Sequence, residues 1–375
     1  MLTVILTAGD VLINSLEPLR GLPISSLDIT GQKQVRDLGP LVGLPLTFLA
    51  ARFTGVRDFS PLQKLPLRRL YLGWYESGFD VTKVRGLQLE ALDAPCFSTV
   101  DLAALAGMPL KELRLWGCDQ LRDISALKNM PLEQLTLAAP DAGTRTLSDL
   151  SPLAGLMLTE LNLSWQQGVT SLEPLRGQQP KRLVLHGTSV KDLSPVMSPL
   201  LRHLAAGFAP ITDVRPLLTT QIESLDFSPQ YVTQGLDELI SLPSMRAICG
   251  YKPDDFRRWR QLCGELSEHN PGFTWFLSAV FTDGHLREAR VFMPLISLAP
   301  LANYADLRVL HLTGTIGDLQ PLAKLPLVEL VCAPTRDAVG LAAIRTMASL
   351  LRIGTTAKNL RPAAEFWRDF DARIR

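Results

Sequence analysis

The sequence predicts an α/β solenoid: short parallel strands stack into one concave sheet, turns and short 3-10 segments return along the convex side, and a helix caps the C-terminus. Three observations predict this architecture, namely a recurring phrase, its nearly constant spacing, and a strand pattern inside each copy. No single copy is long enough to bury its own apolar face, so neighbouring copies must share one core.

The recurring phrase is Asp, an apolar residue, Ser or another residue, Pro and Leu, followed by Gly-Leu-Pro-Leu and then Leu-x-Leu. Its clearest copies begin at Asp37, Asp58, Asp123, Asp149 and Asp318, and weaker copies begin at Ser15, Asp80, Asp101, Ser171, Asp192, Asp213 and Ser297. From Ser15 to Asp213 the anchors are 21 or 22 residues apart, except for one step of 26 after Asp123. That step spans residues 138–146, whose Pro and Gly are typical of a loop insertion. Such a period indicates a leucine-rich-repeat array.

Each part of the phrase has a physical role. Leu-x-x-Leu-x-Leu, as in Leu67, Leu70 and Leu72, supplies a short strand whose alternate residues point inward. Proline cannot donate a ladder hydrogen bond, so Ser-Pro-Leu belongs on the convex return path. The Asp before it is placed to accept hydrogen bonds from nearby backbone N–H groups.

The period and the Asp-Leu-Ser-Pro-Leu turn resemble internalin-type leucine-rich repeats. Internalins place an Asn after the strand, whereas this chain has Thr54, Thr188 and Cys118 at or near that place. We therefore expect the Asn ladder to be absent or replaced by weaker hydroxyl and thiol bonding.

A closer resemblance is to planctomycete-type bacterial repeat regions, which often follow a protein-kinase domain. Residues 231–250 and 336–372 carry this resemblance as two similar closing phrases, and residues 269–301 resemble a module opening. The resemblance covers nearly the whole chain and is specific for architecture, not for a binding partner.

Two closing phrases predict two modules. Residues 1–265 are expected to hold about ten repeats of 21–22 residues with closing helices, around residues 236–242 and 253–262. Residues 266–375 are expected to form a short second repeat module with a C-terminal cap, opened by a hairpin that turns at Asp283 and Gly284. Ile5 or Leu6 already stands where a strand leucine belongs, so the repeat array begins without a polar cap. We therefore expect the chain to be a fragment or to follow another domain.

Composition excludes several classes of protein. Lys plus Arg is 38 and Asp plus Glu is 37, a balance that argues against a general nucleic-acid binder and a polybasic membrane anchor. The five cysteines are widely spaced and lack a Cys-x-x-Cys pair, which is typical of free thiols in a reducing compartment, so a cytoplasmic location is expected. The apolar N-terminus has no basic region or cleavage site, and no apolar run approaches membrane-helix length.

No motif indicates catalysis. Nucleotide-binding glycine loops, kinase signatures, a Gly-x-Ser-x-Gly elbow and a His-Glu-x-x-His pair are all missing from the sequence. His186 and His203 fall on adjacent strands at opposite ends, about 13 Å apart, so they cannot share a zinc ion and are expected to be solvated surface histidines. We expect no enzyme activity, no cofactor and no metal site.

Strand alternation assigns the outward residues to three rows. Within them, Glu160 with Arg182 and Asp93 with Arg114 are expected to form cross-strand ion pairs. Tyr, Trp and Arg most often anchor interfaces, and one aromatic and basic patch spans repeats three to five. Its predicted partner-binding residues are Arg69, Tyr71, Trp74, Arg114 and Trp116. The alternative is that the tryptophans merely cover loop backbones.

The sequence therefore predicts a non-catalytic scaffold that binds a protein partner through its concave face. The alternative is a rigid regulatory or spacer arm packed on an upstream, kinase-like catalytic domain of the same polypeptide. An upstream domain is required by the second hypothesis only.

Overall fold

The computed structural model describes residues 2–7, 12–73, 79–97, 99, 101–140 and 147–372. The chain forms two compact units, of which the first ends at Cys249 and the second begins at Gly250. Among the described residues, no helix combines the length and the apolar character needed to cross a bilayer.

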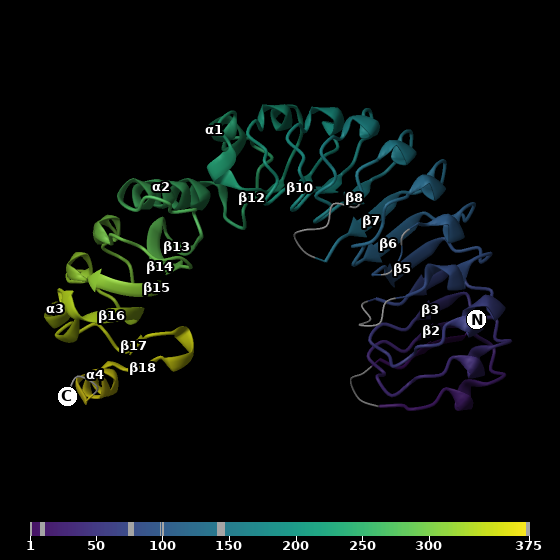
Figure 1. The fold of residues 1–375 in the computed structure, drawn as a ribbon, viewed down its shortest axis with the longest axis horizontal. Helices are drawn as coiled ribbons and strands as arrows, with labels where there is room; N and C mark the ends of the chain where they lie inside the picture. The colour runs from purple at the N-terminus through teal and green to yellow at the C-terminus, as the bar shows by residue number, and fades with distance from the viewer. Residues whose placement is uncertain are drawn as a thin grey trace. The chain divides into compact units, whose positions relative to one another are not determined.

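One parallel sheet runs through the first unit, with its strands paired in the order of the sequence. Its strands are β1 (Leu2–Ile5), β2 (Ile24–Asp28), β3 (Phe48–Ala50), β4 (Arg69–Tyr71), β5 (Ala91–Pro95), β6 (Glu112–Trp116), β7 (Gln134–Ala138), β8 (Glu160–Asn162), β9 (Arg182–Val184), β10 (His203–Ala205), β11 (Ser224–Asp226) and β12 (Ala247–Ile248). Within this unit the strands line the inner edge and the short helices line the outer edge (Figure 1). This is a leucine-rich-repeat solenoid, as the sequence predicts.

A 3-10 helix follows each of the ten anchors of the first unit. They are η1 (Glu17–Leu19), η2 (Gly39–Leu41), η3 (Ser60–Lys64), η4 (Val81–Val84), η5 (Ala103–Leu105), η6 (Ser125–Leu127), η7 (Ser151–Leu153), η8 (Glu173–Leu175), η9 (Ser194–Val196) and η10 (Arg215–Thr219). At the Asp anchors of this unit a carboxylate oxygen accepts from the backbone N–H two residues later at 2.7–2.9 Å. At the anchors Ser15 and Ser171 the hydroxyl oxygen accepts the equivalent bond at 3.1 and 3.2 Å. The repeated Asp therefore caps the convex turn, as expected.

The place of an internalin Asn is taken by other polar residues. Thr54 Oγ1 donates to the Ala51 carbonyl at 3.1 Å and Thr188 Oγ1 to the Leu185 carbonyl at 2.8 Å. Two glutamines at the same repeat position bond between repeats: Gln32 Nε2 donates to the Leu6 carbonyl and Gln166 Nε2 donates to the Leu137 carbonyl. Buried backbone carbonyls thus gain partners without an Asn ladder.

The first unit closes with η11 (Pro229–Tyr231), α1 (Leu236–Ile240) and β12, close to the expected closing helix. The second unit contains α2 (Pro253–His269), β13 (Leu277–Thr282), β14 (His285–Val291), η12 (Ala299–Asn303), β15 (Val309–Asp318), η13 (Gln320–Leu322), β16 (Glu329–Val339), α3 (Leu341–Arg345), β17 (Arg352–Gly354), η14 (Ala357–Asn359), β18 (Arg361–Pro362) and α4 (Ala363–Ala372). Its sheet begins with the expected antiparallel hairpin β13–β14, continues with the parallel strands β15, β16 and β17, and ends with antiparallel β18. Asp283 and Gly284 form the hairpin turn with φ of 50° and 80°.

Helix α2 belongs to the second compact unit, whereas the closing phrases predict residues 253–262 as part of the first module. Trp259, 5% exposed, donates from Nε1 to the Leu277 carbonyl of β13 at 3.0 Å. At the end of α2, Asn270 accepts from the backbone N–H groups of Ile296 and Ser297 at 2.7 and 2.8 Å. The compact units therefore divide between Cys249 and Gly250, sixteen residues before the boundary proposed from the sequence at 265/266.

The Asp caps make stability dependent on pH. The backbone N–H of Ser125 and that of Ser151 hold the pKa values of Asp123 and Asp149 below their ordinary value. A depressed pKa in the folded state stabilises the fold above the unfolded pKa of about 4, and this stabilisation is lost as pH falls through the folded pKa.

We predict that the double variant Asp123→Asn, Asp149→Asn loses less stability than the wild type between pH 5 and about pH 2.5. Asparagine keeps the accepting oxygen but does not titrate. Urea denaturation at each pH measures the difference, and parallel pH profiles for the two proteins would contradict the assigned role of the caps.

Candidate functional site

Four of the five predicted site residues project from the same face of the first sheet. Arg69 and Tyr71 lie on β4, and Arg114 and Trp116 lie on β6. The strands pair in the predicted register, because Tyr71 faces Asp93 and Asp93 in turn faces Arg114. Trp74 lies outside the described residues.

A cation–π group occupies β3 and β4. The Phe48 and Tyr71 rings lie 5.6 Å apart, the Arg69 guanidinium lies 5.1 Å from the Phe48 ring, and the Arg52 guanidinium lies 5.2 Å from the Tyr71 ring. Arg69 is exposed, whereas Phe48, Arg52 and Tyr71 are half-buried. These side chains hold one another in place and form an aromatic and cationic surface on the sheet.

Asp93 is the buried centre of the site, with 5% of its surface exposed. Its Oδ2 lies 2.6 Å from an Arg52 nitrogen, and its Oδ1 accepts from Trp116 Nε1 at 3.0 Å. Asp93 is therefore paired with Arg52, and the prediction that it pairs with Arg114 is wrong. A buried carboxylate needs a cation and hydrogen bonds, and Arg52 and Trp116 together supply both.

The reach of Arg52 to β5 depends on Gly73. Arg52 lies in the repeat of β3, Asp93 lies two strands further on, and Gly73 stands between them in the outermost row. A Cβ at Gly73 would lie 2.6 Å from Arg52 Cγ, which is too close for any real contact. The missing side chain opens a path over β4, and the φ of +66° at Gly73 also favours glycine.

Arg114 is held by Glu112 and Gln134 rather than by Asp93. Its guanidinium lies 3.2 Å from Glu112 and donates to Gln134 Oε1 at 2.9 Å. Glu112 also accepts from the Tyr71 hydroxyl at 3.4 Å. Burial raises the pKa of Tyr71, and the nearby Glu112 charge adds to this, so the phenol stays neutral and donates.

These residues are together called the concave patch: Phe48, Arg52, Arg69, Tyr71, Asp93, Glu112, Arg114 and Trp116. A cavity of about 320 Å³ adjoins it, running from Trp116 across β7, β8 and β9 to Ala205 of β10. Glu160 and Arg182 face each other at its floor, but no ion pair joins them in the described part of the chain, contrary to expectation. The charges of Glu160 and Arg182 are therefore not neutralised by each other, whereas Arg114 and Gln134 of the same cavity are hydrogen-bonded to each other.

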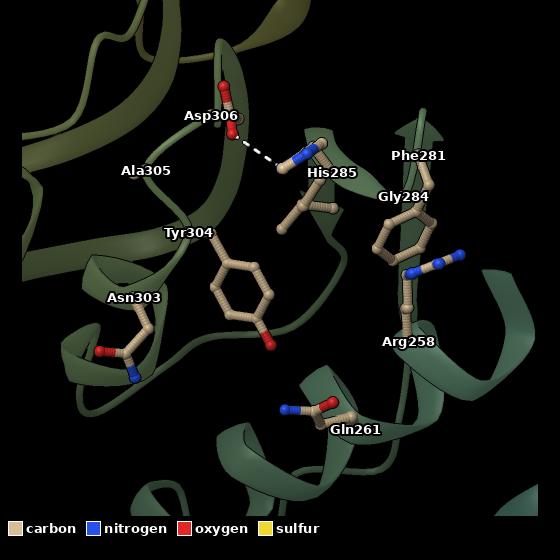
Figure 2. A pocket seen from close by; sticks show the side chains of 10 residues that line it. Arg258, Gln261, Phe281, Gly284, His285, Asn303, Tyr304, Ala305 and Asp306 are labelled. Atoms are coloured by element: carbon tan, nitrogen blue, oxygen red, sulfur yellow. Dashed lines mark ion pairs between the residues drawn. The ribbon is translucent and has the colours of Figure 1, made fainter. Parts of the chain in front are cut away.

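The second unit has its own cavity of about 400 Å³ between α2, the β13–β14 hairpin and the loop after η12. Figure 2 shows His285 pointing toward Asp306, at a distance of 2.9 Å, and the Tyr304 hydroxyl pointing toward α2. Tyr304 donates to Glu265 at 2.8 Å, and burial raises the pKa of Tyr304. Gln261 donates to the same carboxylate at 2.8 Å. The Tyr304 bond ties α2 to the loop after η12, the His285 pair ties β14 to the same loop, and no activated nucleophile stands among the described lining residues.

Sequence reasoning missed Phe48, Arg52 and the position of Asp93 within the site. Phe48 and Arg52 stand in the outward rows that strand alternation defines, so the pattern alone places them on this face. The pattern does not show that the long side chain of Arg52 passes over Gly73 of the next repeat and so reaches Asp93.

The fold defines a leucine-rich-repeat protein. No protein-family model matches the chain, and no curated relative is found by sequence. Among solved structures, an internalin (inlF) from Listeria monocytogenes is 20% identical, with 88% of this chain and 80% of that chain covered and a TM-score of 0.40. The internalin C2 of the same organism is 17% identical, with 68% and 84% covered and a TM-score of 0.32.

A third similar structure comes from a plant. It is the leucine-rich-repeat ectodomain of the Arabidopsis thaliana receptor kinase GASSHO1/SCHENGEN3 in complex with CASPARIAN STRIP INTEGRITY FACTOR 2. It is 16% identical, with 89% of this chain and 46% of that chain covered and a TM-score of 0.31.

We predict that Gly73→Ala destabilises the protein more than Gly43→Ala. Both glycines have positive φ, +66° and +87°, but a Cβ at Gly43 meets no atom within 4 Å. Backbone strain costs each variant about 1–2 kcal/mol. Displacing Arg52 from buried Asp93 costs Gly73→Ala about 1–3 kcal/mol more. Urea denaturation of the two variants measures the difference, and equal losses would show that the Arg52–Asp93 contact adds nothing.

Proposed function

We propose that this protein is a non-catalytic interaction scaffold whose concave patch binds a protein partner. The observation that carries the proposal is the preassembled group of Arg69, Tyr71 and Trp116, which are residue types that dominate binding energy at interfaces. Tyr71 and Trp116 are already ordered by Glu112 and Asp93, so binding loses little side-chain entropy.

The concave patch carries both charge signs. The exposed Arg69 supplies a cationic group at its surface, while Asp93 and Glu112 are engaged by Arg52 and Arg114. A mixed surface of this kind suits a protein partner with aromatic and acidic groups better than a uniformly anionic nucleic acid. We also propose a reducing, cytoplasmic location, which the five free cysteines support.

The alternative to a scaffold is a rigid regulatory or spacer arm that packs on an upstream, kinase-like domain of the same polypeptide. Capture experiments with the isolated chain separate the two hypotheses, because a scaffold binds a separate partner and an arm does not.

We predict that Tyr71→Ala and Trp116→Ala each weaken binding of the partner by about tenfold or more. Gln63→Ala, on the exposed side of η3 in the same repeat as Tyr71, is the matched control and is expected to leave affinity unchanged. Titration calorimetry measures the affinities, and thermal unfolding verifies that each variant is folded. A partner whose affinity is unaffected by both aromatic substitutions would refute the concave patch as its site.

A further inference from the structure

In six of the described repeats the loop position two residues after the last inward strand residue has a left-handed backbone. Three repeats place glycine there, with φ of 84°, 76° and 64° at Gly31, Gly117 and Gly187. Three others place an aromatic residue there, with φ of 53°, 65° and 60° at Phe53, Trp165 and Phe208. A Cβ makes this conformation unfavourable, so glycine is the residue that folding alone favours.

The aromatic residues at this position contribute little to the core. Phe53 is 54% exposed and Phe208 is 61% exposed, while Trp165 is half-buried. A bulky apolar side chain that is both exposed and held in a strained conformation is not explained by stability. Residues of this kind concentrate at binding sites.

Two of these aromatics belong to one cluster on successive repeats. The His186 ring lies 5.5 Å from the Trp165 ring and 5.3 Å from the Phe208 ring, and the outer two rings are 5.7 Å apart. Tyr231, 50% exposed, joins Trp165 and Phe208 in lining a cavity of about 520 Å³. Trp165, His186, Phe208 and Tyr231 are together called the rim cluster. His186 is thus packed among aromatic rings, not simply solvated as the sequence suggested.

Glycines of the next repeat fix the orientation of two of these rings. A Cβ at Gly187 would lie 2.1 Å from Trp165, and a Cβ at Gly207 would lie 2.4 Å from His186. Each ring therefore lies directly against the neighbouring backbone. Trp165 and His186 are therefore ordered before any ligand arrives, which lowers the entropic cost of binding.

The lining of this cavity carries no formal charge. Besides the aromatic rings it contains Gln167, Thr188, Ser189 and Pro210, together with Gly187. The hydroxyls of Thr188 and Ser189 donate to the backbone carbonyls of Leu185 and Gln167, each at 2.8 Å. The Tyr231 hydroxyl and the Gln167 amide are donors that stand at the cavity. A ligand here meets aromatic faces and neutral hydrogen-bond donors.

We propose that the rim cluster binds a proline-rich segment of a partner protein in the polyproline II conformation. Proline rings are apolar and pack on aromatic faces, and proline has no N–H that would need an acceptor. The backbone carbonyls of a polyproline II helix are all unpaired and accept from donors such as Tyr231. An uncharged segment matches an uncharged lining, because a charged side chain buried there would lack a partner. The rim cluster is a second surface, and it acts whether or not the concave patch binds.

The test uses the full chain and an acetylated, amidated decaproline peptide with a fluorophore, followed by fluorescence anisotropy. Trp165→Gly and Phe208→Gly are each expected to weaken binding by about tenfold or more. Their urea midpoints are expected to stay level or rise, because glycine relieves the left-handed strain. Phe53→Gly is the matched control: it has the same repeat position and the same kind of strain, and binding is expected to be unchanged.

A second variant guards against a folding artefact. Gly207→Ala retains every aromatic side chain but displaces the His186 ring, and it is expected to weaken binding as well. The proposal is overturned if the wild type does not bind decaproline, if Phe53→Gly weakens binding as much as Trp165→Gly, or if a Gly-Ser peptide of equal length binds equally well. Binding of maltohexaose in place of the peptide would identify a glycan site and would likewise overturn it.

Discussion

The lateral, in-register pairing of parallel strands is the constraint on which the rest of the structure depends. Leu49, Leu70 and Leu92 stand opposite one another on β3, β4 and β5, and each is fully buried. A shift of one residue in any pair would bring outward polar residues into the core. The regular period keeps this register, and the Asp caps hold the return turns at the length that it requires.

The same register decides where function can lie. Inward positions are committed to the shared core, so recognition has to use the outward rows and the loops that follow the strands. Of the two proposed sites, the concave patch is built from the outward rows, and Trp165 and Phe208 of the rim cluster come from the loops. In both, a glycine in the following repeat makes room for a side chain from the preceding one, as Gly73 does for Arg52 and Gly187 for Trp165.

Periodicity predicted the fold, because anchor spacing, turn chemistry and strand pattern all report on local structure. The same alternation placed Arg69, Tyr71, Arg114 and Trp116 on one face. It could not identify the cation that pairs with Asp93, since Arg52 and Arg114 both stand in outward rows and only the path over Gly73 favours Arg52. Gln32 and Gln166 stand at the same repeat position as Thr54 and Thr188, but the pattern does not reveal that their longer amides reach backbone carbonyls of the preceding repeat. An aromatic residue does not by itself indicate a left-handed backbone. The sequence indicates it for Trp165 and Phe208 only because other repeats have glycine at the same position.

Site-specific photo-crosslinking tests the central claim, that the sheet face is the recognition face, most directly. A photoreactive phenylalanine analogue replaces Arg182 on β9 in one variant and Gln63 on η3 in the other; both positions are exposed, and Arg182 lines the cavity beside the concave patch without belonging to the patch. Mass spectrometry then identifies proteins that are crosslinked in the native cell. The account predicts a specific partner crosslinked from position 182 and not from position 63. A partner crosslinked from position 63 alone would contradict it, because recognition would then lie on the convex turns.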